Sequence, residues 1–215
     1  MPTCQVKICG ITTPAAAETA IRAGADFIGL VFHPASPRNI DPIKAIALIR
    51  YIRALSTTTR CVGLFVDPSD QELDAVSSYL DMIQLHGDES TERCLEIKQR
   101  YERPIIKAIA MSTAVDLTQI KRYEPLCDWL LFDAKPSDSS KELTGGNGVN
   151  FDWTLLQGQD ISAPWMLAGG LTPDNVAQAA ALLRPNAVDV SSGVESTRGV
   201  KDNAEIKAFI AAAKT

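Results

Sequence analysis

Two side chains that follow short apolar runs are of the types used in general acid–base catalysis. Cys9 ends the run Val6–Cys9, and Asp133 follows the apolar run Trp129–Phe132. A thiol with the ordinary pKa of ~8.5 is mostly protonated at pH 7, so Cys9 needs help to act as a base. A carboxyl after an apolar run is costly to bury ionised, which predicts a raised pKa and an acidic role for Asp133. The alternatives are a core-filling thiol and a solvated aspartate that starts a loop.

An arginine and a histidine offer contacts to a ligand. Arg38 stands in the loop His33–Asn39, which two prolines stiffen, and its planar guanidinium suits a carboxylate or a phosphate. His86 follows the short run Met82–Leu85. The alternatives are an ordinary exposed arginine and a histidine that only caps the end of its strand.

Two glycine-containing segments are suited to binding phosphate, because glycine lets backbone N–H groups approach a ligand closely and serine adds a hydroxyl donor. One segment holds Gly169 and Gly170, and the other holds Ser191, Ser192 and Gly193. We expect a short extra helix to assist them, with residues 199–202 at its start. Ordinary turns are the alternative.

The elements that must position these residues alternate along the whole chain. Eight apolar runs are typical of buried parallel strands, and amphipathic segments between them are typical of helices. The expected strands are Gln5–Cys9, Asp26–Val31, Cys61–Val66, Met82–Leu85, Ile105–Ala110, Trp129–Phe132, Trp165–Ala168 and Ala187–Ser191. The expected helices are Ala15–Ala23, Pro42–Ala54, Ser69–Tyr79, Ser90–Tyr101, Ala114–Tyr123, Asp174–Leu183 and Asn203–Ala213, with Thr13-Pro14, Asp41-Pro42 and Thr172-Pro173 as starts. This order predicts one α/β domain over residues 1–215, a closed eight-stranded parallel (β/α)₈ (TIM) barrel.

An aspartate near the start of alternate strands supports this count. Asp26, Asp81, Asp128 and Asp189 stand at separations of 55, 47 and 61 residues, and the two-strand period favours a barrel over unrelated domains. A general preference for aspartate at element starts is the alternative. The register places His86 and Asp133 at the carboxyl ends of their strands, the face that carries the active site in this fold.

Lys7 has two possible roles. It precedes Cys9 by two residues on the same face of the first strand, where its charge would favour the thiolate. The alternation of side chains also allows an ion pair between Lys7 and Asp189 across the join of the first and last strands. The sequence does not decide between the two roles.

Composition excludes several other classes of protein. The chain of 215 residues has a net charge of −5 and 46% hydrophobic residues, so it lacks the basic stripe that nucleic acids require. No apolar stretch approaches the roughly 20 residues of a membrane span. Five cysteines without C-x-x-C pairs, two histidines outside metal-ligand spacing and no secretory leader favour a cytoplasmic protein without a metal. The long polar loop Pro136–Asn150 is expected to be a lid, with a tolerated insertion as the alternative.

In its ordered motifs the chain resembles the phosphoribosylanthranilate isomerases of tryptophan biosynthesis. The match extends over essentially the whole chain, and nine motifs in the right order are far more specific than any one of them. One departure is Asn147, where the family more often has threonine. The motifs are Lys7–Gly10, Gly24–Asp26, Ser36–Arg38, Gln84–Gly87, Leu131–Asp133, Gly145–Gly146, Phe151–Trp153, Leu167–Leu171 and Asp189–Glu195.

The resemblance implies an Amadori rearrangement, without cofactor or metal, of a small phosphorylated substrate by a monomer or homodimer. It implies that Asp133 is the general acid and Cys9 the general base, and that Arg38 holds the anthranilate carboxylate. The phosphate would bind at Gly169, Gly170, Ser191, Ser192 and Gly193. The alternatives are the related aminoaldose isomerase of histidine biosynthesis, which usually pairs two aspartates, a barrel accepting both substrates, and a non-catalytic barrel that only binds a phosphorylated ligand.

Overall fold

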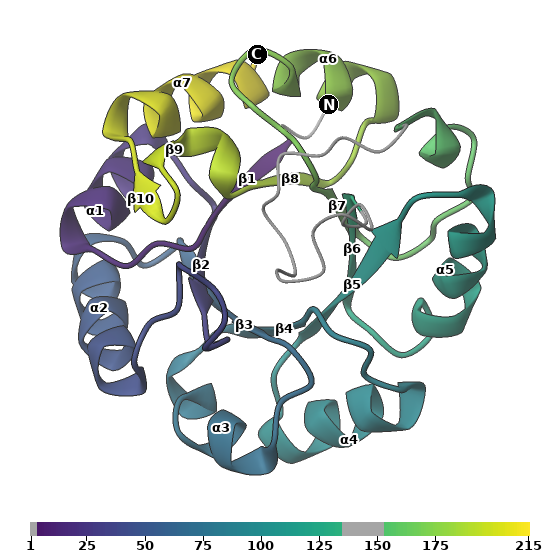
Figure 1. Ribbon diagram of the computed structural model, residues 1–215, viewed down its shortest axis with the longest axis horizontal. Coiled ribbons are helices and arrows are strands. Elements are labelled where there is room, and N and C mark those ends of the chain that lie inside the picture. The colour runs from purple at the N-terminus through teal and green to yellow at the C-terminus, as the bar shows by residue number, and fades with distance from the viewer. Residues whose placement is uncertain (1–3, 135–152) are drawn as a thin grey trace.

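The computed structural model describes residues 4–134 and 153–215. Eight parallel strands close into a barrel in the order β1 to β8, and the helices surround it (Figure 1). This arrangement confirms the predicted (β/α)₈ fold, and each predicted strand agrees with the structure to within two residues at either end. The strands are β1 (Gln5–Cys9), β2 (Phe27–Val31), β3 (Arg60–Phe65), β4 (Met82–Leu85), β5 (Ile105–Met111), β6 (Trp129–Ala134), β7 (Trp165–Leu167) and β8 (Ala187–Val190).

Two of the three helix starts predicted from a capping residue followed by proline are confirmed. Thr13 and Asp41 cap α1 and α2, each followed by proline. The predicted start at Thr172-Pro173 is wrong, because Asn175 holds residues 172–175 in a turn by accepting from the Thr172 N–H at 2.8 Å. The α-helices are α1 (Pro14–Ala23), α2 (Pro42–Leu55), α3 (Asp70–Asp74), α4 (Thr91–Tyr101), α5 (Thr118–Tyr123), α6 (Val176–Leu183) and α7 (Asn203–Ala213).

Short elements complete the described chain. The 3₁₀ helices are η1 (Ser77–Tyr79), η2 (Ala114–Leu117), η3 (Trp153–Leu156) and η4 (Ser192–Val194). The antiparallel strands β9 (Glu195–Thr197) and β10 (Val200–Lys201) form a hairpin after η4. The helix expected over Ala114–Tyr123 is therefore divided between η2 and α5.

The helix predicted over Ser69–Tyr79 is also shorter than expected. A capping box of Ser69 and Glu72 starts α3, but Val76 leaves the helical conformation and the chain continues as η1. β-Branched and serine residues are weak helix formers, and Val76 is fully buried, so packing decides the conformation here.

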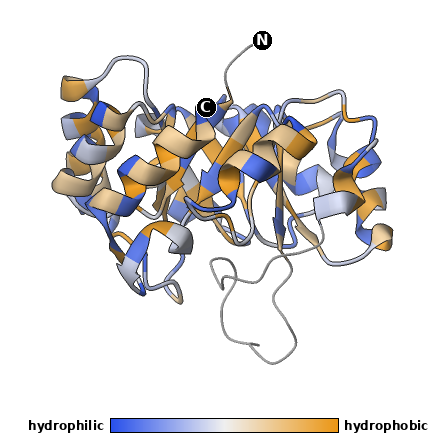
Figure 2. Ribbon diagram, turned by 90° about the horizontal axis from the view of Figure 1, so that it is seen from above, coloured by the Kyte–Doolittle hydropathy of each residue, from blue (hydrophilic) through white to orange (hydrophobic). Residues whose placement is uncertain are grey.

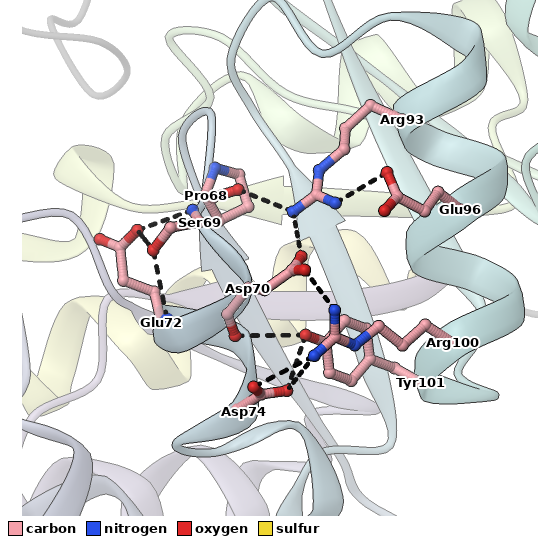
Figure 3. A network of polar contacts seen from close by, with 9 residues as sticks. All are labelled: Pro68, Ser69, Asp70, Glu72, Asp74, Arg93, Glu96, Arg100 and Tyr101. Carbon is pink, nitrogen blue, oxygen red and sulfur yellow. Dashed lines mark hydrogen bonds and ion pairs between the residues drawn. The ribbon is translucent and has the colours of Figure 1, made fainter.

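Polar contacts join the short α3 to α4. Asp70 accepts from Arg93 at 2.6 Å and also pairs with Arg100, while Asp74 accepts from Tyr101 at 2.9 Å (Figure 3). These contacts compensate for the small apolar face of a helix of five residues.

The aspartate repeat has a structural cause, and one member of it was wrongly assigned. Asp26, Asp81 and Asp128 each precede a strand and accept the backbone N–H of the strand before it, at 2.8, 2.7 and 2.8 Å. The residue that does the same before β8 is Asn186, whose Oδ1 accepts from the Trp165 N–H at 3.0 Å. Asp189 instead lies within β8.

The barrel has an apolar layer outside the strands and a smaller one inside. Figure 2 shows apolar residues concentrated on the strands, with apolar and polar residues mixed along the surrounding helices. The inner cluster includes Phe27, Met82, Leu131 and Ala187 near the amino ends of their strands. Because side chains alternate along a strand, later residues of the same parity also point inward, among them the polar residues nearer the carboxyl ends.

Candidate active site

Cys9 ends β1 and is 3% exposed. Gly29 of β2 lies directly beside it, since a Cβ at Gly29 would stand 2.8 Å from the thiol sulfur. Burial raises the pKa of the Cys9 thiol, although the charges of Lys7 and Lys201 act in the opposite direction. Cys9 therefore rests as a thiol that two neighbouring cations bias toward the thiolate.

Lys7 forms the ion pair that the sequence allowed, and its charge also lies close to Cys9. Its Nζ lies 3.0 Å from Asp189 Oδ1, at the register where β1 and β8 close the barrel. Burial disfavours the ammonium charge, but Asp189 and Cys9 outweigh this effect and raise the pKa of Lys7. Lys7 thus stays charged inside the barrel, paired with Asp189 and next to the thiol.

On the opposite side of the barrel, Asp133 lies near the end of β6 and His86 directly after β4, as predicted. His86 Nε2 is 3.3 Å from Asp133 Oδ2, and the Ala134 N–H donates to Asp133 Oδ1 at 2.8 Å. Both side chains are 15% exposed, so they reach solvent while remaining largely enclosed.

Arg38 lies over the barrel mouth, but part of its guanidinium already binds a carboxylate. Its Nε and Nη2 donate to Glu195 at 2.6 and 2.8 Å. The side chain packs on Gly10, whose φ of +78° and lack of a side chain leave room for it. Because Nε and Nη2 bind Glu195, the edge of the guanidinium that carries Nη1 is the one that could bind a ligand.

Glu195 and Lys201 are functional candidates that sequence reasoning missed. Lys201 Nζ donates to Glu195 Oε1 at 2.7 Å and to the Ser191 carbonyl at 2.9 Å. Burial opposes ionisation of Glu195, but hydrogen bonds from Arg38 and Lys201 prevail and lower its pKa to about 2. Glu195 is the last residue of the Asp189–Glu195 motif, and this position in the motif could have identified it as a candidate.

The two predicted phosphate loops lie side by side. Gly169 and Gly170 have φ of +81° and +68°, a conformation that favours glycine. A Cβ at Gly193 would overlap the Leu171 carbonyl, so this glycine lets the loops after β7 and β8 touch. Ser192 and Gly193 belong to η4, whereas the predicted helix start at 199–202 is wrong because β10 occupies residues 200–201.

One cavity brings most of the predicted residues together. Gly169, Gly170, Ser192 and Gly193 are outside its lining, although Gly169 lies beside Asp133. A second cavity of about 490 Å³ adjoins it and shares His86 and Asp133. The expected lid Pro136–Asn150 lies outside the described residues. The first cavity is lined by Cys9, Val31, His33, Ser36, Arg38, Leu64, Val66, His86, Asp133, Asp189 and Ser191.

The Ser191 hydroxyl already has a protein partner, because it donates to the Cys9 carbonyl at 3.1 Å. This bond ties the loop after β8 to the end of β1, where the thiol lies. Within residues 4–134 and 153–215 there is no group of three or more His, Cys, Asp or Glu side chains that would hold a metal ion. The helices of these same ranges include none with the length and apolar character to cross a membrane.

Comparison with known proteins gives a consistent result. The model of the N-(5′-phosphoribosyl)anthranilate isomerase family matches residues 6–212. The enzyme of that name from Paramagnetospirillum magneticum is 50% identical, over 98% of this chain and 97% of the relative. The one from Paracoccus denitrificans is 48% identical, over 97% of this chain and 96% of the relative.

Solved structures agree with these sequence matches. Phosphoribosylanthranilate isomerase from Thermotoga maritima superposes with a TM-score of 0.87 at 38% identity, with 99% of each chain covered. A phosphoribosylanthranilate isomerase in complex with reduced 1-(o-carboxyphenylamino)-1-deoxyribulose 5-phosphate superposes with a TM-score of 0.84 at 37% identity, again over 99% of each chain.

Proposed function

The chain belongs to the N-(5′-phosphoribosyl)anthranilate isomerase family and is an aldose–ketose isomerase of tryptophan biosynthesis, and we propose that Cys9 and Asp133 carry out its reaction as base and acid. The product is 1-(2-carboxyphenylamino)-1-deoxyribulose 5-phosphate. The observation that carries the assignment of roles is that these two side chains, from β1 and β6, open onto one cavity.

In the first step Asp133 donates its proton to the ribose ring oxygen. The bond between that oxygen and C1′ breaks, and the nitrogen lone pair forms a protonated Schiff base at C1′. The carboxylate left on Asp133 accepts a hydrogen bond from the Ala134 N–H, and His86 Nε2 lies 3.3 Å from its other oxygen. These donors stabilise the charge that develops on Asp133 during the transfer.

In the second step the Cys9 thiolate removes the proton from C2′. The electron pair of that C–H bond moves toward the iminium nitrogen and gives an enolamine. The enolamine takes a proton at C1′, loses the proton of its C2′ hydroxyl and becomes the ketone. Burial raises the pKa of Cys9, so the thiolate is a strong base once formed, and Lys7 helps to form it.

Binding at both ends of the substrate orients the ribose between the two groups. We assign the phosphate to Gly169, Gly170, Ser191, Ser192 and Gly193, and the anthranilate carboxylate to the Nη1 edge of Arg38. The positive φ values of Gly169 and Gly170 and the adjacent Lys201 support the phosphate site. Fixing both ends converts the proton transfers into steps within one bound complex.

The test is the loss of phosphoribosylanthranilate fluorescence with purified variants. Cys9→Ala and Asp133→Ala should each abolish turnover while product binding stays largely intact. The matched controls are Cys4→Ala and Asp74→Asn, at a half-buried thiol and an exposed carboxyl outside the cavity, which should keep activity. Near-normal turnover in either site variant would remove that residue from its role, and binding without turnover by the unaltered protein would indicate a non-catalytic barrel.

Three further proposals concern the domain organisation, the cellular compartment and the oligomeric state. We propose that residues 1–215 form one domain that works in the cytoplasm as a monomer or homodimer. The five cysteines are all unpaired, which suits a reducing compartment, and the Thermotoga maritima relative is described both as a dimer and as engineered monomers. Sedimentation and a single cooperative unfolding transition test the oligomeric and domain assignments.

A further inference from the structure

A chain of polar side chains crosses the barrel interior and ends on Asp133. Lys7 Nζ lies 3.0 Å from Asp189 and 2.7 Å from Gln84 Oε1. Gln84 Nε2 lies 2.9 Å from His86 Nδ1, and His86 Nε2 lies 3.3 Å from Asp133 Oδ2. Gln84 is fully buried on β4, two residues before His86, so both point inward.

The chemistry of Lys7 fixes the direction of every bond in this chain. An ammonium group is only a donor, so the atom of Gln84 that faces Lys7 must be the carbonyl oxygen. The amide NH₂ then faces His86 Nδ1, which must accept. In a neutral imidazole whose Nδ1 accepts, the proton is on Nε2, the ring nitrogen that lies 3.3 Å from Asp133 Oδ2.

We infer that Gln84 is a positioning residue that sets the tautomer of His86 and so supplies a fixed hydrogen-bond donor to Asp133. The inference rests on the proposed role of Asp133. When Asp133 gives its proton to the ring oxygen, the resulting carboxylate meets a donor already in place. In the other tautomer an Nε2 lone pair would face the same carboxylate and oppose its formation.

The buried ion pair of Lys7 and Asp189 acts on both sides of the barrel. Asp189 keeps Lys7 charged, Lys7 orients the Gln84 amide, and Gln84 acts on Asp133 only through His86. The ion pair of Lys7 and Asp189 therefore serves the acid on the far side of the barrel as well as Cys9 beside it.

Gln84→Glu is the sharpest perturbation, because it keeps the shape of the side chain and its bond to Lys7. A carboxylate accepts at both ends, so His86 Nδ1 must then carry a proton. Gln84→Met removes the polar contact with a side chain of similar length. It serves as the second variant should the new carboxylate fail to be accommodated.

The readout is ¹⁵N NMR of histidine in the full-length protein, which has only His33 and His86, with His33→Asn to assign the signals. The unaltered protein should show a protonated Nε2 and an accepting Nδ1 for His86. Gln84→Glu should move the proton signature to Nδ1, and Gln84→Met should give a mixture of tautomers. A protonated Nδ1 in the unaltered protein, or a His86 signal unchanged in both variants, overturns the inference.

Kinetics then test the link to the reaction. Gln84→Glu should lower kcat by about tenfold to a hundredfold with a small change in KM, as for other partners that orient a functional imidazole. If the His86 tautomer changes in Gln84→Glu while kcat stays the same, the inferred effect of the tautomer on the reaction is wrong. The NMR result does not depend on turnover, so a protein without isomerase activity would refute the proposed function and leave the tautomer assignment standing.

Discussion

Replacing Glu195 by glutamine should destabilise the protein strongly and in a way that depends on pH. The carboxylate binds Arg38 through two hydrogen bonds and Lys201 through a third, and the three side chains are 4%, 6% and 3% exposed. Removing its charge leaves two cations buried without their shared partner. Breaking a buried ion pair by removing one member costs about 3–5 kcal/mol.

The pKa of Glu195 gives an independent magnitude. It falls from 4.5 to about 2 on folding, and at about 1.4 kcal/mol per pKa unit its ionisation stabilises the folded state by about 3 kcal/mol. Because the folded pKa is the lower one, this stabilisation is present above about pH 4.5 and is lost as the pH falls toward 2. The stability difference between unaltered protein and Glu195→Gln should shrink by about 2 kcal/mol between pH 5 and pH 3.

The assay is urea unfolding followed by tryptophan fluorescence at pH 7, 5 and 3. The control is Glu18→Gln, whose carboxyl pairs with the exposed Arg22 on α1 and should leave the midpoint nearly unchanged. Equal stability of Glu195→Gln and the unaltered protein at pH 7 would refute the reasoning. So would a stability difference that stays constant from pH 5 to pH 3.

Further predictions concern the base, the substrate anchor and the helix contacts. Gly29→Ala should push the Cys9 thiol from its place and lower kcat by more than tenfold in a folded protein, measured with circular dichroism as the control. Lys7→Met should move the acid limb of the kcat/KM profile to higher pH, because the charge that lowers the pKa of Cys9 is gone; an unchanged limb would contradict this. Arg38→Met should mainly raise KM, and an unchanged KM would count against its contact with the carboxylate. Asp70→Asn should lower the urea midpoint by loosening α3, with little effect on kcat.

The fold could be predicted because buried parallel strands have a local signature. Runs such as Phe27–Val31 are apolar throughout, since both faces of the strand are covered. The ends of helices were less predictable where burial decides, as at Val76, or where a side chain holds the residues before the helix in a turn, as at Asn175. Asp189 was assigned to the wrong structural role because a one-dimensional repeat does not reveal that Asn186 performs the same task as an aspartate.

The candidate site could be predicted only where it coincides with strand ends. Cys9, His86 and Asp133 follow apolar runs, so the register alone places them at the mouth of the barrel. A contact between distant segments has no local sequence pattern that would predict it. Arg38 and Glu195, for example, are separated by 157 residues. Likewise, Gln84 is a single polar residue in a buried strand, and only its contacts give it a role.

The side-chain charges around the cavity do not by themselves explain how an acidic protein can bind an acidic substrate. Among the described residues of the site, three cations face three carboxyl groups, and Lys7 and Arg38 are each already paired at short distance. If Asp133 carries a proton before the reaction, as its role as acid requires, the site has one positive charge in excess. That excess is too small to hold a phosphate and a carboxylate by side-chain charge alone.

In the phosphate site proposed above, backbone N–H groups would provide the remaining stabilisation, and these groups are insensitive to pH. Two loops held together at Gly193, with Gly169 and Gly170 in conformations that glycine favours, can present such groups without adding net charge. Transfer of the Asp133 proton to the substrate then leaves the charge of the whole complex unchanged. The chain from Lys7 to His86 has the matching property, since it delivers a donor to Asp133 through a neutral amide and a neutral imidazole. These donors can thus stabilise the charge that forms on Asp133 without changing their own charge.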